Sequence, residues 1–145
     1  MQRVLPALLL SVLAGCAAPT QAPPPPPARS YQCLLPTEQR MLVAELFFGR
    51  NIPGRGRLTD VEWAKFAADT ITPNFPDGFT ELDGEGQWRN PQTGRIAHDP
   101  AKILLVAVKR SPELAGRLTA VMDAYMTRYR QQSVGIITRD SCAAF

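Results

Sequence analysis

Five consecutive prolines, Pro23 to Pro27, divide the chain into a part that cannot join a folded core and a part that can. Proline lacks a backbone N–H and its ring fixes φ, so a run of prolines favours an extended polyproline II rod over a helix or an inner strand. About 115 residues follow residue 30, which is enough for one domain with a core of about two layers.

The residues ahead of the prolines have the pattern of an export signal. One cation, Arg3, precedes an apolar run from Val4 to Leu13, and small residues follow that run. The run is too short to span a bilayer as a helix of the mature protein. We therefore predict a signal peptide over residues 1–15.

The end of this signal, LAGC at residues 13–16, resembles the lipobox of bacterial lipoproteins. In that pattern the Cys16 sulfur takes a diacylglyceryl group, and cleavage leaves Cys16 as an acylated first residue that anchors firmly. The alternative is an ordinary secretory signal with a cysteine there by chance. Ala17 stands where an aspartate would be the familiar signal for retention in the inner membrane. The pattern therefore favours an outer-membrane anchor, facing the periplasm.

Residues 16–32 are then expected to form a lipidated, proline-rich tether. At about 3.1 Å per residue, such a tether holds a domain roughly 40 Å from the membrane. We expect a spacer here rather than a PxxP ligand for a partner. The folded domain is expected over residues 33–145.

The charge pattern points away from nucleic acid. The formal net charge is +3, and the basic residues are spread along the chain, whereas nucleic-acid binding needs a localised basic face. His98 is the only histidine, which excludes zinc or haem iron held by several imidazoles of one chain. We predict no cofactor.

Beyond residue 30 the hydrophobic pattern predicts six elements. They are a strand at 41–48, a helix at 58–71, extended segments at 77–90 and 95–109, a helix at 111–130 and a strand at 133–140. Thr59 is expected to cap the first helix, with Glu62 closing a capping box, and Pro73 to end it. Ser111 is expected to cap the second helix, with Pro112 at its first position.

The order β-α-β-β-α-β predicts an α+β fold, a ferredoxin-like sandwich with two helices on one face of a four-stranded antiparallel sheet. In that topology the first and last strands are antiparallel neighbours. Cys33, before the first strand, then lies beside Cys142, after the last. Once Cys16 is acylated these are the only thiols left in an oxidising compartment, so we predict a Cys33–Cys142 disulfide.

The stretch LDGEGQWRN, residues 82–90, is the one most suggestive of a cofactor loop. As a dinucleotide loop it fails, because Arg89 occupies the next required glycine position and no helix follows. As a calcium loop beginning at Asp83 it fails, because Trp88 stands where a glycine must turn and Gly94 where a glutamate must chelate. What remains is a strand whose glycines suggest a bulge or a helix packed close above it.

Alternation along this strand predicts two faces. We expect Glu81, Asp83, Glu85, Gln87 and Arg89 on the face open to solvent, and Thr80, Leu82, Gly84, Gly86 and Trp88 toward the helices.

A polar site is a candidate feature of that open face. The residues expected to converge there are Glu45, Asp83, Gln87, Arg89 and His98, with Asp99 next to His98. A carboxylate beside a histidine is suited to general acid–base work. The alternative, which we favour over catalysis, is a solvated face with ordinary ion pairs such as Glu85 with Arg89. No activated nucleophile is recognisable, and no catalytic residue is assigned.

The same face is also expected to have an apolar middle. Val43 and Phe47 contribute to it, together with alternate residues of 102–108. An exposed apolar sheet face usually marks a partner, a ligand or a second copy of the chain, so a homodimer through this face is one expectation.

Four stretches carry a resemblance to a known family. They are ELFFGRN, VEWAKFAADTITPNFPDGFTELDGEGQWRNPQTGRI, AKILLVAV and the closing DSC, within residues 40–142. Together they resemble a family of bacterial exported proteins that is known only as a domain of unknown function. The resemblance implies a small α+β domain, often behind a lipoprotein signal, and it implies no activity and no catalytic residues.

Two hypotheses of function follow. The first is a non-enzymatic envelope lipoprotein whose domain binds a partner or a small ligand through its open sheet face. The alternative is an enzyme or small-molecule binder of the dimeric α+β-barrel kind, with the five polar residues lining a pocket between two sheets.

Overall fold

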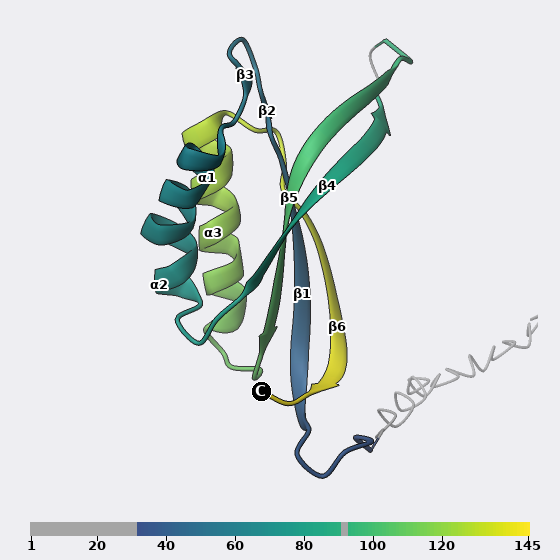
Figure 1. Ribbon diagram of the computed structural model, residues 1–145, viewed down its shortest axis with the longest axis vertical. Coiled ribbons are helices and arrows are strands. Elements are labelled where there is room, and N and C mark those ends of the chain that lie inside the picture. The colour runs from purple at the N-terminus through teal and green to yellow at the C-terminus, as the bar shows by residue number, and fades with distance from the viewer. Residues whose placement is uncertain (1–31, 91–92) are drawn as a thin grey trace, which may run out of the picture. The chain divides into compact units, whose positions relative to one another are not determined.

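Four long strands form one antiparallel sheet, and the helices lie on one of its faces (Figure 1). The computed structural model describes residues 32–90 and 93–145. The elements are β1 (Gln39–Gly49), β2 (Asn51–Ile52), β3 (Gly56–Arg57), α1 (Asp60–Phe66), a π-helical turn (Ala67–Ile71), α2 (Thr72–Asn74), β4 (Thr80–Arg89), β5 (Ile96–Val108), α3 (Leu114–Tyr129) and β6 (Gly135–Ala143). The predicted signal peptide and Cys16 lie outside the described residues and stay predictions.

The strand order is β4-β5-β1-β6, with every neighbouring pair antiparallel. This is the order of a ferredoxin-like sandwich, which confirms the predicted fold class. The short β2–β3 hairpin lies between the predicted first strand and first helix, where no element was predicted. None of the helices in the described residues is long and apolar enough to cross a membrane.

Pairing of the first and last strands brings the two cysteines together, as predicted. Cys33 and Cys142 form a disulfide whose Cα atoms lie 5.6 Å apart, within the usual range for such a bridge. The bridge closes a loop spanning 109 residues, and cross-linking residues so far apart restricts the unfolded chain strongly.

The core lies between the sheet and the helices. Strand β1 contributes alternate residues, and α1 and α3 contribute stripes at helical spacing. Its centre is an aromatic cluster with mostly edge-to-face contacts, made of Phe48, Trp63, Phe66, Tyr125 and Tyr129. The buried residues of α1 and α3 recur at helical spacing, so each helix turns one face toward the sheet.

Helix α1 begins as the sequence predicts. The Glu62 N–H donates to Thr59 Oγ1 (3.2 Å), and the Thr59 N–H donates to Glu62 Oε2 (2.9 Å). The second bond, together with the Arg55 guanidinium, lowers the pKa of Glu62 to about 2. Pro73, however, does not end the helix, which was the expectation. A π-helical turn precedes it, and the chain stays helical through Asn74. A proline is tolerated in this last turn because little helix follows it.

The start of α3 also differs from the prediction. The helix begins at Leu114, with Glu113 in the cap position and no side-chain cap, rather than at Pro112 with Ser111 as its cap. Ser111 still contributes, since its carbonyl accepts a hydrogen bond from the Leu114 N–H (3.2 Å). The serine therefore forms the preceding turn instead of the cap.

The faces of β4 are the reverse of the prediction. Asp83 pairs in register with Lys102, which lies on the same face as the core residue Leu104. Asp83 is therefore on the helix side, and Leu82 and Trp88 are on the open face, together with Gly84 and Gly86. No residue of this edge strand is buried, so core burial does not dictate its orientation; its register with β5 does.

Candidate functional site

A cleft of about 730 Å³ lies on the open face of the sheet, toward the tip of the β4–β5 hairpin. Figure 1 shows that this tip leans away from the helices, so the hairpin forms a wall beside the end of β1. The lining residues are Phe47, Gly49, Asn51, Pro53, Gly86, Gln87, Trp88, Ala97, His98, Asp99, Ala101, Gln131, Gln132, Ser133 and Gly135. We call this feature the open-face cleft.

The strand walls of the cleft combine large aromatic side chains with very small ones. Phe47 and Trp88 supply aromatic surface, and Trp88 is 45% exposed. Glycines stand where the chains come close: a Cβ on Gly135 would lie 3.4 Å from the Phe47 side chain, and a Cβ on Gly86 would lie 3.4 Å from the Asp99 carbonyl oxygen. These small residues leave the space that the cleft occupies.

The loop between α3 and β6 forms the opposite rim. Arg130 has a left-handed backbone (φ 52°), which ends α3 and turns the chain toward the β1–β2 loop. The Arg130 side chain donates to the Pro53 carbonyl (2.9 Å), and Gln131 Nε2 donates to the Asn51 carbonyl (2.9 Å). Two side chains thus fix this rim to β2 and to the turn that follows it.

Gly49 lines the cleft between these two loops. A Cβ there would lie 2.6 Å from Asp99 Oδ2 and 3.6 Å from Gln131 Oε1, so the two oxygens approach one point. On the helix side, the Tyr125 hydroxyl donates to the Gly49 carbonyl (2.8 Å). Burial raises the pKa of Tyr125, so this hydroxyl stays protonated and continues to donate.

Only two of the five predicted site residues line the cleft. Gln87 and His98 are among its lining residues, opposite each other on β4 and β5. Their register places both on the same face as Asp83, so the prediction that their side chains lie on the open face is wrong. Arg89, in register with Ile96 near the hairpin tip, also lies on the face of Asp83 and does not line the cleft, so its predicted place on the open face is wrong. Glu45 is on the open face as predicted, but there it forms an ion pair with Arg139 (2.5 Å) outside the cleft.

Asp83 belongs to a different feature altogether. On the helix side it forms an ion pair with Lys102 (Nζ to Oδ1, 2.7 Å). This contact lowers the pKa of Asp83, and the positive charges of Arg50 and Arg57 lower it further. Arg50 in turn contacts Asp60 (2.8 Å) at the start of α1. The expected convergence of Asp83 with Glu45 is therefore wrong, because the two carboxylates lie on opposite faces of the sheet.

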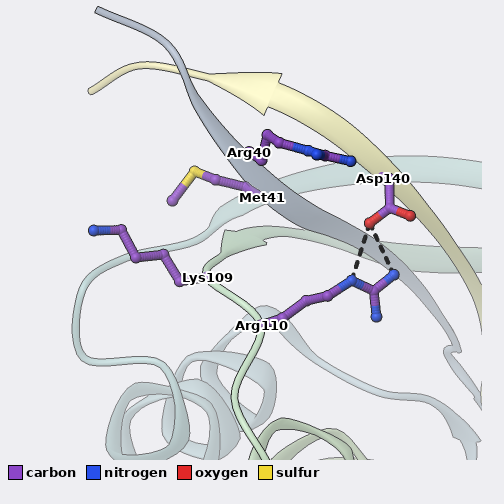
Figure 2. Close-up of a pocket in the computed structure, with 5 residues that line it drawn as sticks. All are labelled: Arg40, Met41, Lys109, Arg110 and Asp140. Atoms are coloured by element: carbon purple, nitrogen blue, oxygen red, sulfur yellow. Dashed lines mark hydrogen bonds and ion pairs between the residues drawn. The ribbon is translucent and has the colours of Figure 1, made fainter. Parts of the chain in front are cut away.

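A smaller hollow of about 400 Å³ lies at the other end of the sheet (Figure 2). Its lining residues are Arg40, Met41, Lys109, Arg110 and Asp140. The Arg110 guanidinium contacts Asp140 (Nη2 to Oδ1, 2.8 Å), and Figure 2 shows the Lys109 side chain pointing away from that pair. Exposed charges around a shallow hollow are ordinary surface features, so this hollow is the weaker candidate.

One group of potential metal ligands occurs among the described residues, and it is not a metal site. Cys33, Glu38 and Cys142 have ligand atoms within 4.8 Å of one another, but the two sulfurs are joined in the disulfide. Since a thiolate rather than a disulfide sulfur binds metals, the group is explained by the bridge.

Sequence reasoning missed most of the cleft. Asp99 entered only as the neighbour of His98, and Trp88 was placed under the helices. Gln131 and Asn51 are 80 residues apart in the chain, and no sequence pattern brings them together. The one available signal was the pair of glycines in β4, which we interpreted as packing under a helix.

Residues 43–145 match the family described as "Protein of unknown function (DUF3574)". The match covers more than half of the chain, so the chain belongs to this family. No curated protein matches it in sequence.

Solved structures similar to the chain include a phage SAM lyase in complex with S-methyl-5'-thioadenosine, at 14% identity and a TM-score of 0.57, covering 72% of this chain and 90% of that chain. A phage SAM lyase in the apo state is similar at 14% identity and a TM-score of 0.53, covering 80% of this chain and 97% of that chain. CutA from Synechococcus elongatus follows at 9% identity and a TM-score of 0.48, with 72% and 80% covered. At these identities the likeness to the lyase shows the fold alone, and the CutA likeness is too weak to add to it.

Proposed function

We propose that this member of the DUF3574 family is a bacterial envelope lipoprotein whose domain binds a small molecule in the open-face cleft. The observation that carries the proposal is the cleft itself. Its volume of about 730 Å³ falls in the range typical of small-molecule sites. Aromatic walls and a few convergent polar groups are also typical of such sites.

The lining residues favour binding over catalysis. Among the described residues, no carboxylate forms an ion pair or hydrogen bond with the His98 side chain, which leaves that histidine without the orienting partner that acid–base chemistry uses. The lining serine, Ser133, has no hydrogen bond to a base among those residues, so it is not an activated nucleophile.

The envelope location rests on two supports. The lipobox at residues 13–16 predicts acylation of Cys16, with the outer membrane facing the periplasm as the destination. The Cys33–Cys142 disulfide fits an oxidising compartment. Labelling cells with radioactive palmitate tests the first support. The wild-type protein should incorporate label and fractionate with the outer membrane, and Cys16→Ser should do neither. Label retained in Cys16→Ser would contradict lipidation at this residue.

Binding is tested by a thermal-shift screen of the purified full chain against a small-molecule library, repeated by tryptophan fluorescence. Trp63 is only 2% exposed, so changes in emission on binding come chiefly from Trp88. We expect hits that raise the melting temperature and alter the emission. Trp88→Ala should abolish both effects, whereas Leu82→Ala, on the same face but outside the cleft, should keep them. Hits that survive Trp88→Ala would place the ligand elsewhere, and an empty screen would count against the proposal.

A second candidate function is self-association through the open face. Leu82 and Ile137 are 51% and 52% exposed there, on the two edge strands, and an apolar sheet face of this kind suits a second copy of the chain. The dimeric α+β-barrel arrangement would close the cleft between two sheets. Sedimentation velocity separates the cases: a dimer that Ile137→Lys converts to a monomer supports this candidate, and a wild-type monomer at high concentration rules it out.

A further inference from the structure

The chemistry of the open-face cleft is concentrated at the acceptor pair, Asp99 Oδ2 and Gln131 Oε1. Both oxygens lie within 4 Å of the position that a Cβ on Gly49 would take. Carboxylate and amide carbonyl oxygens accept hydrogen bonds and donate none. A ligand group placed between them therefore has to bring donors.

The surrounding hydrogen bonds hold both acceptors in this orientation. Gln131 Nε2 donates to the Asn51 carbonyl (2.9 Å), and this bond orients Gln131 Oε1 toward Gly49. The Asn51 backbone N–H donates to Asp99 Oδ1 (3.3 Å), the carboxylate oxygen on the other side from the pair. Asn51 Nδ2 donates to the His98 carbonyl (3.3 Å) and so ties the β1 end to β5. The acceptor pair is thus fixed before any ligand arrives.

The charge at the acceptor pair is not neutralised by the protein. None of the residues that the structure describes around the cleft is a lysine or an arginine. Among the described residues, no cationic nitrogen lies within 4 Å of the Asp99 carboxylate. Arg50, the neighbour of Gly49 in the chain, lies on the helix side, where it donates to the Leu58 carbonyl and contacts Asp60. A half-buried carboxylate in such a place favours a cation.

The walls suit a cation that carries an apolar body. Phe47 and Trp88 present aromatic surface, and aromatic faces attract cations and pack against apolar groups. On β5 the lining residues Ala97 and Ala101 contribute small, apolar side chains. The cleft therefore has one polar end, at the acceptor pair, and one apolar end, at the aromatic side chains.

We propose that the open-face cleft binds a protonated amine with an apolar or aromatic body, whose ammonium group donates to Asp99 Oδ2 and Gln131 Oε1. This inference rests on the proposed function, since it names the ligand class of the same cleft. A primary ammonium has three donors and a positive charge, which match two converging acceptors beside an unpaired carboxylate. A quaternary ammonium has no donor and leaves Gln131 Oε1 unsatisfied.

The test compares three probes that share a 2-phenylethyl body and differ in the charge of the end group: phenethylamine, 2-phenylethanol and 3-phenylpropionate. Each is titrated into the full chain at pH 7 while Trp88 emission is followed. Hydrogen bonds to charged groups are worth more than neutral ones, so the amine should bind about tenfold or more tightly than the alcohol. The carboxylate probe should bind more weakly than either.

Two variants tie the preference to the acceptor pair. Asp99→Asn keeps the shape and removes the charge, so the ratio of amine to alcohol affinity should fall to about one, since the charge-assisted bond is lost. Gly49→Ala places a methyl group 2.6 Å from Asp99 Oδ2 and so displaces the carboxylate without removing it; the ratio should fall there too. Leu82→Ala, outside the cleft, should leave the ratio unchanged.

Failure of this inference is distinguishable from failure of the proposed function. Alcohol or carboxylate binding as tight as amine binding overturns the ligand class and leaves a small-molecule cleft in place. An amine preference that persists in Asp99→Asn also overturns the ligand class and leaves the small-molecule cleft in place. If none of the three probes alters Trp88 emission at millimolar concentration, the ligand class is again overturned. The cleft itself is then judged by the library screen and its Trp88→Ala control.

Discussion

Both faces of the sheet carry large apolar side chains, but these are buried on the helix face and partly exposed on the open face. On the helix face, Leu46, Phe48 and Leu104 are completely buried against the aromatic cluster. On the open face, Leu82 and Ile137 are about half exposed, and the space between the strands and loops is hollowed into a cleft. The helix face therefore forms a closed core, and the open face does not.

Two aspartates of the same hairpin make this contrast clear. Asp83 faces the helix side, where it pairs with the nearly buried Lys102 and contacts Arg50 (3.6 Å). Asp99 faces the open side and accepts only a backbone N–H among the described residues. One carboxylate neutralises cations of the fold, and the other is left for a group from outside. Charge that the protein itself satisfies indicates structure, and charge that it leaves unsatisfied indicates binding.

The largest expected effect breaks the packed face. Phe48→Ala removes the centre of the aromatic cluster and should lower the free energy of unfolding by about 3–5 kcal/mol. Leu82→Ala, at a half-exposed site on the open face, should cost less than about 1 kcal/mol. Urea unfolding of the full chain, followed by circular dichroism, measures both. Equal losses would mean that the open face is also a packed core in solution.

A smaller effect separates the two aspartates. Asp83→Asn leaves Lys102, within the described part of the chain, with only the distant Asp60 carboxylate (3.8 Å), so the melting temperature should fall, though by less than with Phe48→Ala. Asp99→Asn breaks no ion pair and should leave the melting temperature nearly unchanged while it abolishes amine selectivity. Differential scanning calorimetry gives both temperatures. A larger fall for Asp99→Asn than for Asp83→Asn would reverse the assigned roles.

Acid should weaken the helix side of the molecule. The carboxyls with lowered pKa lie on the helical segments and on the helix side of β4, and the pKa of Glu62 falls from 4.5 to about 2. A group whose pKa is lowered by folding stabilises the fold above its unfolded pKa, and this contribution is lost as pH falls through its folded pKa. The free energy of unfolding should therefore decline between about pH 4.5 and pH 2.

Glu62→Gln tests this directly. The variant should lose part of the pH dependence over that range, because its capping group no longer titrates, as measured by urea unfolding at a series of pH values. Thr59→Ala removes the partner in the capping box and should cost about 1 kcal/mol at neutral pH. A pH dependence identical to the wild type in Glu62→Gln would show that acid acts elsewhere.

Much of the helix face was predictable from the sequence, because its signals are local. Hydrophobic periodicity predicted β1 and the two long helical segments, and the Thr59–Glu62 pair predicted the start of α1. The order of elements selected the topology, and the topology placed Cys33 beside Cys142. Each of these inferences needed only residues close in sequence, or a connection rule that holds for the whole fold.

The open face was decided by tertiary structure. The orientation of β4 follows from its register with β5, and its own composition, with Leu82 and Trp88 on one side, suggested the opposite orientation. The cleft exists because the turn after Arg130 brings Gln131 to the end of β1, beside Asp99. Contacts between segments so far apart leave no periodic trace in the sequence. The sequence alone therefore determined what this protein buries, and only the folded chain decided what it leaves open.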